Sequence, residues 1–165
     1  MKKLLKSRLI LVPFLIVSIL LVPSCVSGKT VTLTVPNVTQ PAPTGTYTSN
    51  GQRIFLTGTS ASGGYIYSQG YMMMGRYLVC ADCHGTQGKG GNVAMMMYSF
   101  KAPNITWTAL TDSTQYNPPY TVDTLKRAIT QGIGSDGTAL NTFMPRWNIP
   151  SADLDDLVSF IQTLK

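Results

Sequence analysis

Cys80-Ala81-Asp82-Cys83-His84 places two thiols three positions apart, with an imidazole directly after the second thiol. The whole sequence of 165 residues has only three cysteines and one histidine, so this stretch holds two of its three thiols and its only imidazole. A structural zinc site usually needs four Cys or His ligands, and a scaffold built on disulfides needs more cysteines. This scarcity argues against both of those classes.

The spacing Cys-x-x-Cys-His is typical of covalent attachment of c-type haem. Two thiols at this spacing can form thioether bonds to both vinyl groups of one haem, and the next residue then holds its imidazole against the iron. We therefore expect one haem c, attached through Cys80 and Cys83, with His84 as the proximal ligand. Three other interpretations stay open: a thioredoxin-like dithiol, a zinc site that lacks its fourth ligand, and a disulfide that closes a very short loop.

The N-terminus predicts export from the cytoplasm. A basic stretch ends at Arg8, and an apolar run follows over 9–22, which is shorter than the roughly 20 residues of a bilayer span and typical of a signal peptide. The next residues, Leu21-Val22-Pro23-Ser24-Cys25, resemble the lipobox of bacterial lipoproteins. This resemblance implies that 1–24 is removed and that Cys25 carries a lipid anchor. Ordinary cleavage nearby and an uncleaved anchor are the alternatives, and all three place the rest of the chain outside the cytoplasm.

The formal net charge of +6 and the sequence pI of about 9.3 describe the uncleaved chain. Residues 1–81 carry +7 and residues 82–165 carry −1, so the positive charge belongs to the N-terminal half. A chain that begins at Cys25 carries only +2. Nucleic-acid binding needs basic residues gathered on the folded domain, and this distribution argues against it.

Composition divides the rest of the chain into three predicted segments. Residues 25–50 are rich in Thr and Pro with no acid and predict a flexible tether, and 51–69 predict a loop-rich extension with at most one short strand. Residues 70–165 predict the main domain, with a mostly irregular middle between His84 and Tyr120. Helical patterns occupy 71–83, 121–131 with Thr121 as N-cap and Gly132 as stop, and the C-terminal segment from Ser151 as cap to Leu164.

The region from about 70 to 165 resembles class I cytochrome c. The resemblance rests on the haem motif, the Gly-rich loop after it, Ala102-Pro103-Asn104-Ile105, Met144-Pro145 and the terminal amphipathic helix. It implies an all-α, small class I cytochrome c fold, with three to four helices around a covalently bound haem and an extended N-terminal tether.

The resemblance also implies further residues of the haem site. Met144 matches the methionine that serves as the sixth iron ligand, and Pro103 matches the proline whose carbonyl accepts from the ligating histidine; a plain turn proline is the alternative. Arg146 and Trp147 adjoin Met144 and are candidates for contact with the haem, ahead of Trp107 and Tyr98. Two alternatives to Met144 as sixth ligand are an open sixth position and a methionine from one of two triplets, 72–74 and 95–97. We expect both triplets to pack around the haem, and neither to ligate iron nor to bind copper.

A haem with both axial positions filled by His and Met exchanges one electron and leaves no position for a substrate. We therefore expect a membrane-anchored electron carrier, not an enzyme, located in the periplasm or on the outer face of the cytoplasmic membrane. Its expected partners are extracytoplasmic redox proteins or a respiratory or photosynthetic complex. The competing class is a peroxidase-like haem enzyme or a gas sensor, in which Met144 does not hold the iron.

Overall fold

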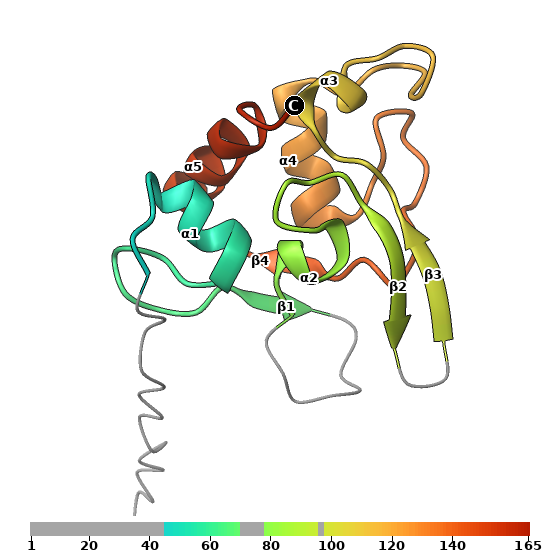
Figure 1. The fold of residues 1–165 in the computed structure, drawn as a ribbon. Helices are drawn as coiled ribbons and strands as arrows, with labels where there is room; N and C mark the ends of the chain where they lie inside the picture. Colours follow the sequence, from blue (N-terminus) through green and yellow to red (C-terminus); the bar gives the residue numbers. More distant parts are fainter. Residues whose placement is uncertain (1–44, 70–77, 96–97) are drawn as a thin grey trace, which may run out of the picture. The chain divides into compact units, whose positions relative to one another are not determined.

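The computed structural model describes residues 45–69, 78–95 and 98–165 (Figure 1). Within these ranges the chain forms five helices and four strands. In chain order they are α1 (Asn50–Thr57), β1 (Tyr67–Gln69), α2 (Cys80–His84), β2 (Gly91–Met95), β3 (Tyr98–Ala102), α3 (Trp107–Leu110), α4 (Val122–Gln131), β4 (Arg146–Asn148) and α5 (Ser151–Ile161).

The prediction of an all-α fold with three to four helices is wrong. The described residues contain five helices and two antiparallel sheets of two strands each, β1 with β4 and β2 with β3. The β2–β3 hairpin pairs Gly91 with Ala102 at its open end and Met95 with Tyr98 at its closed end. It occupies part of the stretch between His84 and Tyr120 that was predicted to be mostly irregular. Gly88 and Gly90 precede β2 and Pro103 follows β3, so the run between them can form a ladder.

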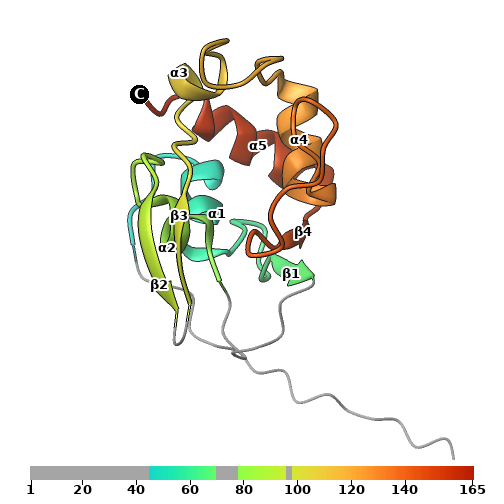
Figure 2. The ribbon, with the colours of Figure 1, turned by 90° about the vertical axis from the view of Figure 1, so that its right-hand side faces the viewer.

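The interpretation of 51–69 as loops with at most one short strand is wrong for its first residues, which belong to α1. Ser49 caps α1 by accepting from the Gln52 N–H at 3.1 Å, and Gly58 ends it in the left-handed conformation. α1 lies beside α5 in both ribbon views (Figures 1 and 2), and the contact is close because Gly51 has no side chain to separate the two helices. The ring centroids of Phe55 and Phe160 are 5.4 Å apart across it.

The two predicted helices of the C-terminal half are present. α4 begins after Thr121, whose side chain accepts from the Thr124 N–H, and it ends at Gly132 as expected. α5 differs at its start, since Ser151 is its first residue and Pro150 precedes it without a side-chain cap. The helix expected over 71–83 falls partly outside the described residues, and α2 is its described end.

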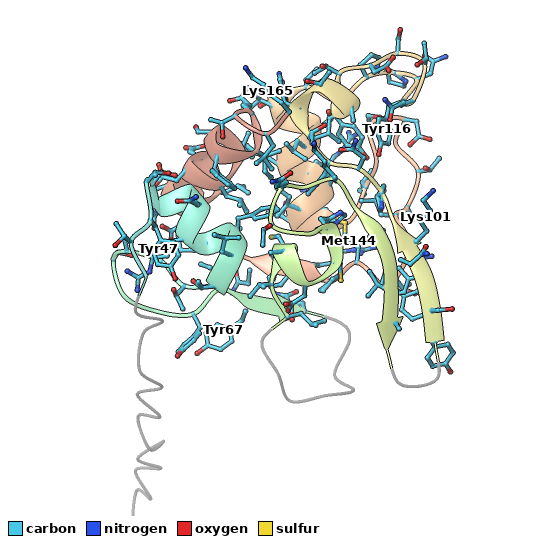
Figure 3. All side chains as sticks on the ribbon, in the orientation of Figure 1. Tyr47, Tyr67, Lys101, Tyr116, Met144 and Lys165 are labelled. Atoms are coloured by element: carbon cyan, nitrogen blue, oxygen red, sulfur yellow. The ribbon has the colours of Figure 1, made fainter. Side chains whose placement is uncertain are left out.

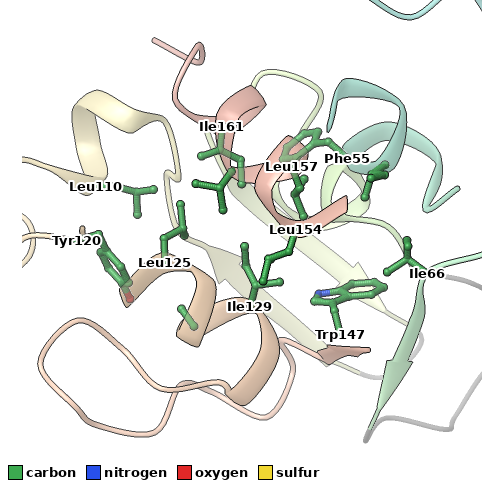
Figure 4. Close-up of a cluster of buried hydrophobic side chains, with 13 residues drawn as sticks. Phe55, Ile66, Leu110, Tyr120, Leu125, Ile129, Trp147, Leu154, Leu157 and Ile161 are labelled. Atoms are coloured by element: carbon green, nitrogen blue, oxygen red, sulfur yellow. The ribbon is translucent and has the colours of Figure 1, made fainter. Parts of the chain in front are cut away.

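The core gathers side chains from α1, α3, α4, β4 and α5, together with Ile66, which directly precedes β1 (Figure 4). Phe55, Leu110, Leu157 and Val158 are its most deeply buried members, and burial of a Leu or Phe side chain contributes about 1.5–3 kcal/mol. Among the described residues, no helix has the length and apolar character needed to cross a bilayer. The predictions for 1–24, Cys25 and most of the tether, and those for the triplet 72–74, lie outside the described residues.

Candidate haem site

A cavity of about 280 Å³ lies inside the described domain, close to the lower end of the roughly 300–1,000 Å³ typical of ligand pockets. Its walls come from α2, β3, α4, α5 and the loops that carry Tyr116 and Met144. Most of the lining side chains are apolar, including Leu125 and Ile129 of α4 and Leu157 of α5. Such a cavity suits a large apolar group that must be kept from water.

Cys80 and Cys83 open on this cavity from α2. Residues three positions apart lie on the same side of a helix, and the first turn is fixed because the Val79 N–H donates to the Asp82 carboxylate at 3.0 Å. Burial raises the pKa of the Cys80 thiol to about 12, and burial together with the Asp82 charge raises the pKa of Cys83. A thioredoxin-like dithiol needs a lowered thiol pKa, so this environment does not favour that alternative.

His84 is the last residue of α2, lies buried and lines the same cavity. Its Nδ1 atom lies 2.9 Å from the carbonyl oxygen of Pro103, and since a carbonyl can only accept, Nδ1 carries the proton and Nε2 is left with a lone pair. Burial lowers the pKa of His84, while the contact with Pro103 raises it in part. The neutral imidazole, with Nε2 available, is the form that binds a metal.

The loop between His84 and Pro103 has the geometry that this contact needs. The Gly90 N–H donates to the His84 carbonyl at 2.8 Å, and the Ile105 N–H donates to the Gly88 carbonyl at 2.7 Å. Gly90 has a φ of +71°, and a side chain there would lie 2.6 Å from the Pro103 carbonyl group. A glycine at this position therefore lets the chain bring the Pro103 carbonyl to the imidazole.

Met144 lines the cavity from the loop that precedes β4, and Figure 3 labels it near the centre of the view. Its N–H donates to the Asn141 carbonyl at 3.1 Å. Trp147, which is 8% exposed, also lines the cavity from β4. Arg146 is not among the lining residues, and its guanidinium donates to backbone carbonyls of the loop before it, so its contact with haem stays a prediction.

The other sequence candidates are not brought to the cavity. Trp107 packs against the core and Tyr98 is 53% exposed, and neither lines the cavity. The triplet 72–74 and Met96 and Met97 lie outside the described residues. Among the described residues, no group of three His, Cys, Asp or Glu side chains could hold a metal ion, so the zinc alternative gains no support.

Four aromatic residues that line the cavity were missed by the sequence reasoning. Tyr116 and Tyr120 meet edge to face at 5.0 Å, and the Tyr116 hydroxyl donates to the Asn104 carbonyl at 3.3 Å. Burial raises the pKa of both phenols. Phe100 and Phe143 are stacked, with centroids 4.9 Å apart and ring planes inclined by 1°. Phe143 directly precedes Met144, so adjacency could have indicated it; the other three carry no local signal.

The sequence matches the protein family model described as Cytochrome c over residues 49–165. This match spans more than half of the chain, so the chain belongs to the cytochrome c family, and the prediction of a c-type cytochrome is confirmed. It is a haem-binding electron-transfer protein, of a family whose members are generally electron carriers and bind haem c, typically through Cys. Neither the curated proteins nor the solved structures gave a match.

The residues present fit a haem c group. Two thiols on one side of α2, an imidazole with its Nδ1 proton engaged and a thioether all open on one cavity with apolar walls. This donor set combines the two attachment points with a nitrogen and a sulfur ligand of the kinds that haem iron accepts in electron carriers.

Proposed function

We propose that this protein is a membrane-anchored monohaem cytochrome c that transfers one electron at a time, with His84 and Met144 as axial ligands. In this proposal Cys80 and Cys83 form the thioether bonds to the single haem. The observation that carries the proposal is that these four side chains line one apolar cavity. When bound, the haem supplies a one-electron Fe(III)/Fe(II) couple, whose potential Met/His ligation raises.

The protein's own residues support this couple in three ways. The Pro103 carbonyl holds the His84 ring in one orientation and makes its Nε2 a stronger donor. The apolar side chains of α4 and α5 limit the access of water to the cavity. Fewer water molecules then have to reorient when the charge on the iron changes. With both axial positions filled, no position remains for a substrate, which favours an electron carrier over a peroxidase-like enzyme or a gas sensor.

The anchoring part of the proposal rests on the sequence. Cys25 follows a signal-like segment, 1–24, and would carry the lipid, and 25–50 would act as a tether that lets the domain reach its partners. The folded domain of this proposal joins 51–69 to 70–165, because α1 packs against α5 in one shared core. The proposed location is the periplasm or the outer face of the cytoplasmic membrane, and the proposed partners are redox proteins or a respiratory or photosynthetic complex.

The ligand set is tested on the full chain produced with a cytochrome maturation system. We expect haem to stay on the protein in a denaturing gel, and the reduced protein to bind CO slowly. Met144→Ala should abolish the weak red-region absorption band that a thioether gives to oxidised haem and should speed CO binding. Rapid CO binding by the unaltered protein would contradict the electron-carrier proposal, and loss of haem on the gel would contradict covalent attachment.

Two matched sets of variants separate the remaining alternatives. Replacing the methionines of 72–74 or 95–97 by leucine should leave the red-region band unchanged, whereas loss of the band in one set would move the ligand away from Met144. Cys25→Ser should release the haem protein from the membrane fraction, because it removes the proposed site of acylation. If the Cys25→Ser protein stays with the membrane, the lipid anchor is wrong while the haem assignment is unaffected.

A further inference from the structure

The Arg146 guanidinium lies against the backbone of the loop that carries Met144. Its Nη1 atom donates to the Met144 carbonyl, and its Nη2 atom donates to the Leu140 carbonyl at 3.1 Å. Longer contacts of 3.5 Å reach the carbonyls of Asn141 and Gly132. One side chain therefore joins the two ends of the loop between α4 and β4.

Gly132 makes room for this side chain. It ends α4 in the left-handed conformation with φ of +68°, and a Cβ atom built on it would overlap the Arg146 guanidinium. The Leu140 N–H also donates to the Gly132 carbonyl at 2.8 Å. The Gly132 carbonyl at the end of α4 therefore accepts from both the loop backbone and Arg146. Gly132 thus has a second role beyond its helix-ending conformation.

Arg146 is itself held in place. It is the first residue of β4 and pairs with Gln69 of β1, while its neighbour Trp147 packs into the core. Among the described residues one ion pair forms, between Lys126 and Asp155, so no described carboxylate pairs with Arg146. Its two Nη atoms donate to backbone carbonyl oxygens instead.

We propose that Arg146 is a positioning residue for Met144, whose guanidinium clamps the ligand loop against the end of α4 and so keeps the Met144 thioether directed into the cavity. This inference rests on the proposed function, in which Met144 is the sixth ligand. A lysine cannot replace the clamp, because an ammonium group has three donors that radiate from one atom and lacks the fork that spans two carbonyls. The clamp acts through geometry rather than through the charge alone.

The test compares four variants of the full haem-loaded protein. Arg146→Ala and Arg146→Lys remove the fork, and Gly132→Ala displaces it with a methyl group. Gly137→Ala is the matched control, since Gly137 lies in the same loop with φ of +85° but has no described atom within 4 Å of the added Cβ. The control therefore experiences similar backbone strain without touching Arg146.

The readouts are the red-region thioether band of the oxidised protein and the rate at which CO displaces the thioether in the reduced protein. In the first three variants we expect a weakened band and CO binding faster by about tenfold or more, the effect of losing one or two charge-assisted hydrogen bonds. In Gly137→Ala we expect a change of less than about twofold, because strain at an exposed turn stays local.

The outcomes separate this inference from the proposed function. If the Met144→Ala variant shows the same red-region band as the unaltered protein, Met144 is not the ligand and both proposals fail. If Met144→Ala abolishes the band but Arg146→Ala and Arg146→Lys behave as the unaltered protein, only the clamp is overturned. Arg146→Lys tests the fork even if Arg146→Ala does not fold, and a fully normal Arg146→Lys protein would overturn the geometric role.

Discussion

The Nδ1 atom of His84 and the carbonyl oxygen of Pro103 are 2.9 Å apart, although 19 positions separate the two residues in the sequence. The β2–β3 hairpin fills that interval and returns the chain to α2, so an imidazole at the end of a short helix meets a carbonyl just after a strand. Gly90 lies against the same Pro103 carbonyl group, which makes the contact accessible to mutation without altering either partner.

Gly90→Ala is expected to break the His84–Pro103 contact. The new Cβ would lie 2.6 Å from the Pro103 carbonyl carbon and oxygen and would also overlap the Ala102 carbonyl oxygen, and these backbone atoms cannot turn aside. Alanine at a positive φ strains the backbone, and the clash adds the usual cost of overpacking, about 1–3 kcal/mol. We therefore expect the free energy of unfolding to fall by that much more than backbone strain alone would cause. Denaturant unfolding measures this cost, and the NMR signal of the His84 ring N–H should exchange faster with water.

Gly63→Ala is the control for this comparison. Gly63 has φ of +89° and no described atom within 4 Å of an added Cβ, so it experiences backbone strain only. Equal losses of stability in the two variants, with an unchanged His84 ring proton, would show that the Pro103 carbonyl is not held by the close approach of Gly90.

Gly51→Ala is expected to destabilise the protein although alanine is the better helix former. The substitution should gain about 1 kcal/mol of helix propensity in α1. The added Cβ would, however, meet the backbone of Asp156 in α5 and lie 2.8 Å from the Cβ atom of Phe160. Since overpacking costs about 1–3 kcal/mol, we expect a lower melting temperature.

Ser159→Ala supplies the matching control in α5. Ser159 is exposed on that helix, so alanine there gains propensity without a clash and should leave the melting temperature equal or slightly higher. A Gly51→Ala protein that melts at or above the unaltered protein would mean that α1 and α5 are not in close backbone contact.

Features fixed by neighbouring residues were predictable from the sequence, and features that depend on distant partners were not. The Cys80–His84 motif and α4 both follow from local signals, the first from ligand spacing and the second from Thr121 and Gly132 at its ends. α1 was missed because a helix of eight residues is stabilised by packing, here against α5 about 100 residues later. β2, β3 and β4 were missed for the same reason, since each strand needs a partner.

The residues beside Met144 illustrate a finer limit. Adjacency suggested that Arg146 and Trp147 both face the haem, yet successive residues of a strand point to opposite sides. Once β4 pairs with β1, only one of the two can line the cavity, and Trp147 is the one that does. Arg146 then faces the ligand loop, where its side chain meets the carbonyl of Met144.

Phe143→Ala is expected to lower the reduction potential of the haem-loaded protein. The stacked pair of Phe143 and Phe100 forms part of the cavity wall beside Met144, and such a pair contributes about 0.5–1.5 kcal/mol beyond its burial. Without the ring, water reaches the cavity and stabilises the oxidised haem, which carries one more positive charge than the reduced form. A potentiometric titration measures the change.

Tyr98→Ala is the control for the loss of Phe143 from the cavity wall. The Tyr98 ring lies 5.8 Å from Phe143 but is 53% exposed and does not line the cavity. Its removal should leave the potential close to that of the unaltered protein. If the two variants lower the potential equally, the effect comes from the aromatic cluster as a whole and not from the wall of the cavity.

Acid is expected to remove a stabilising contribution from the turn after α3. The Asp112 carboxylate accepts from Gln115 Nε2 at 3.0 Å and from Thr114 Oγ1 at 2.7 Å, and these bonds, that of Gln115 first, hold the pKa of Asp112 below its ordinary 3.8. The native state therefore binds fewer protons than the unfolded chain at this site. The contribution is complete above pH 3.8 and is lost as the pH falls through the lowered pKa.

Gln115→Ala should therefore raise the pKa of Asp112 toward 3.8, as followed by the NMR titration of its carboxyl carbon. Asp112→Asn should flatten the dependence of unfolding free energy on pH in that acidic range, because an amide has no proton to bind. An Asp112 that titrates at or above 3.8 in the unaltered protein would contradict the role of these hydrogen bonds.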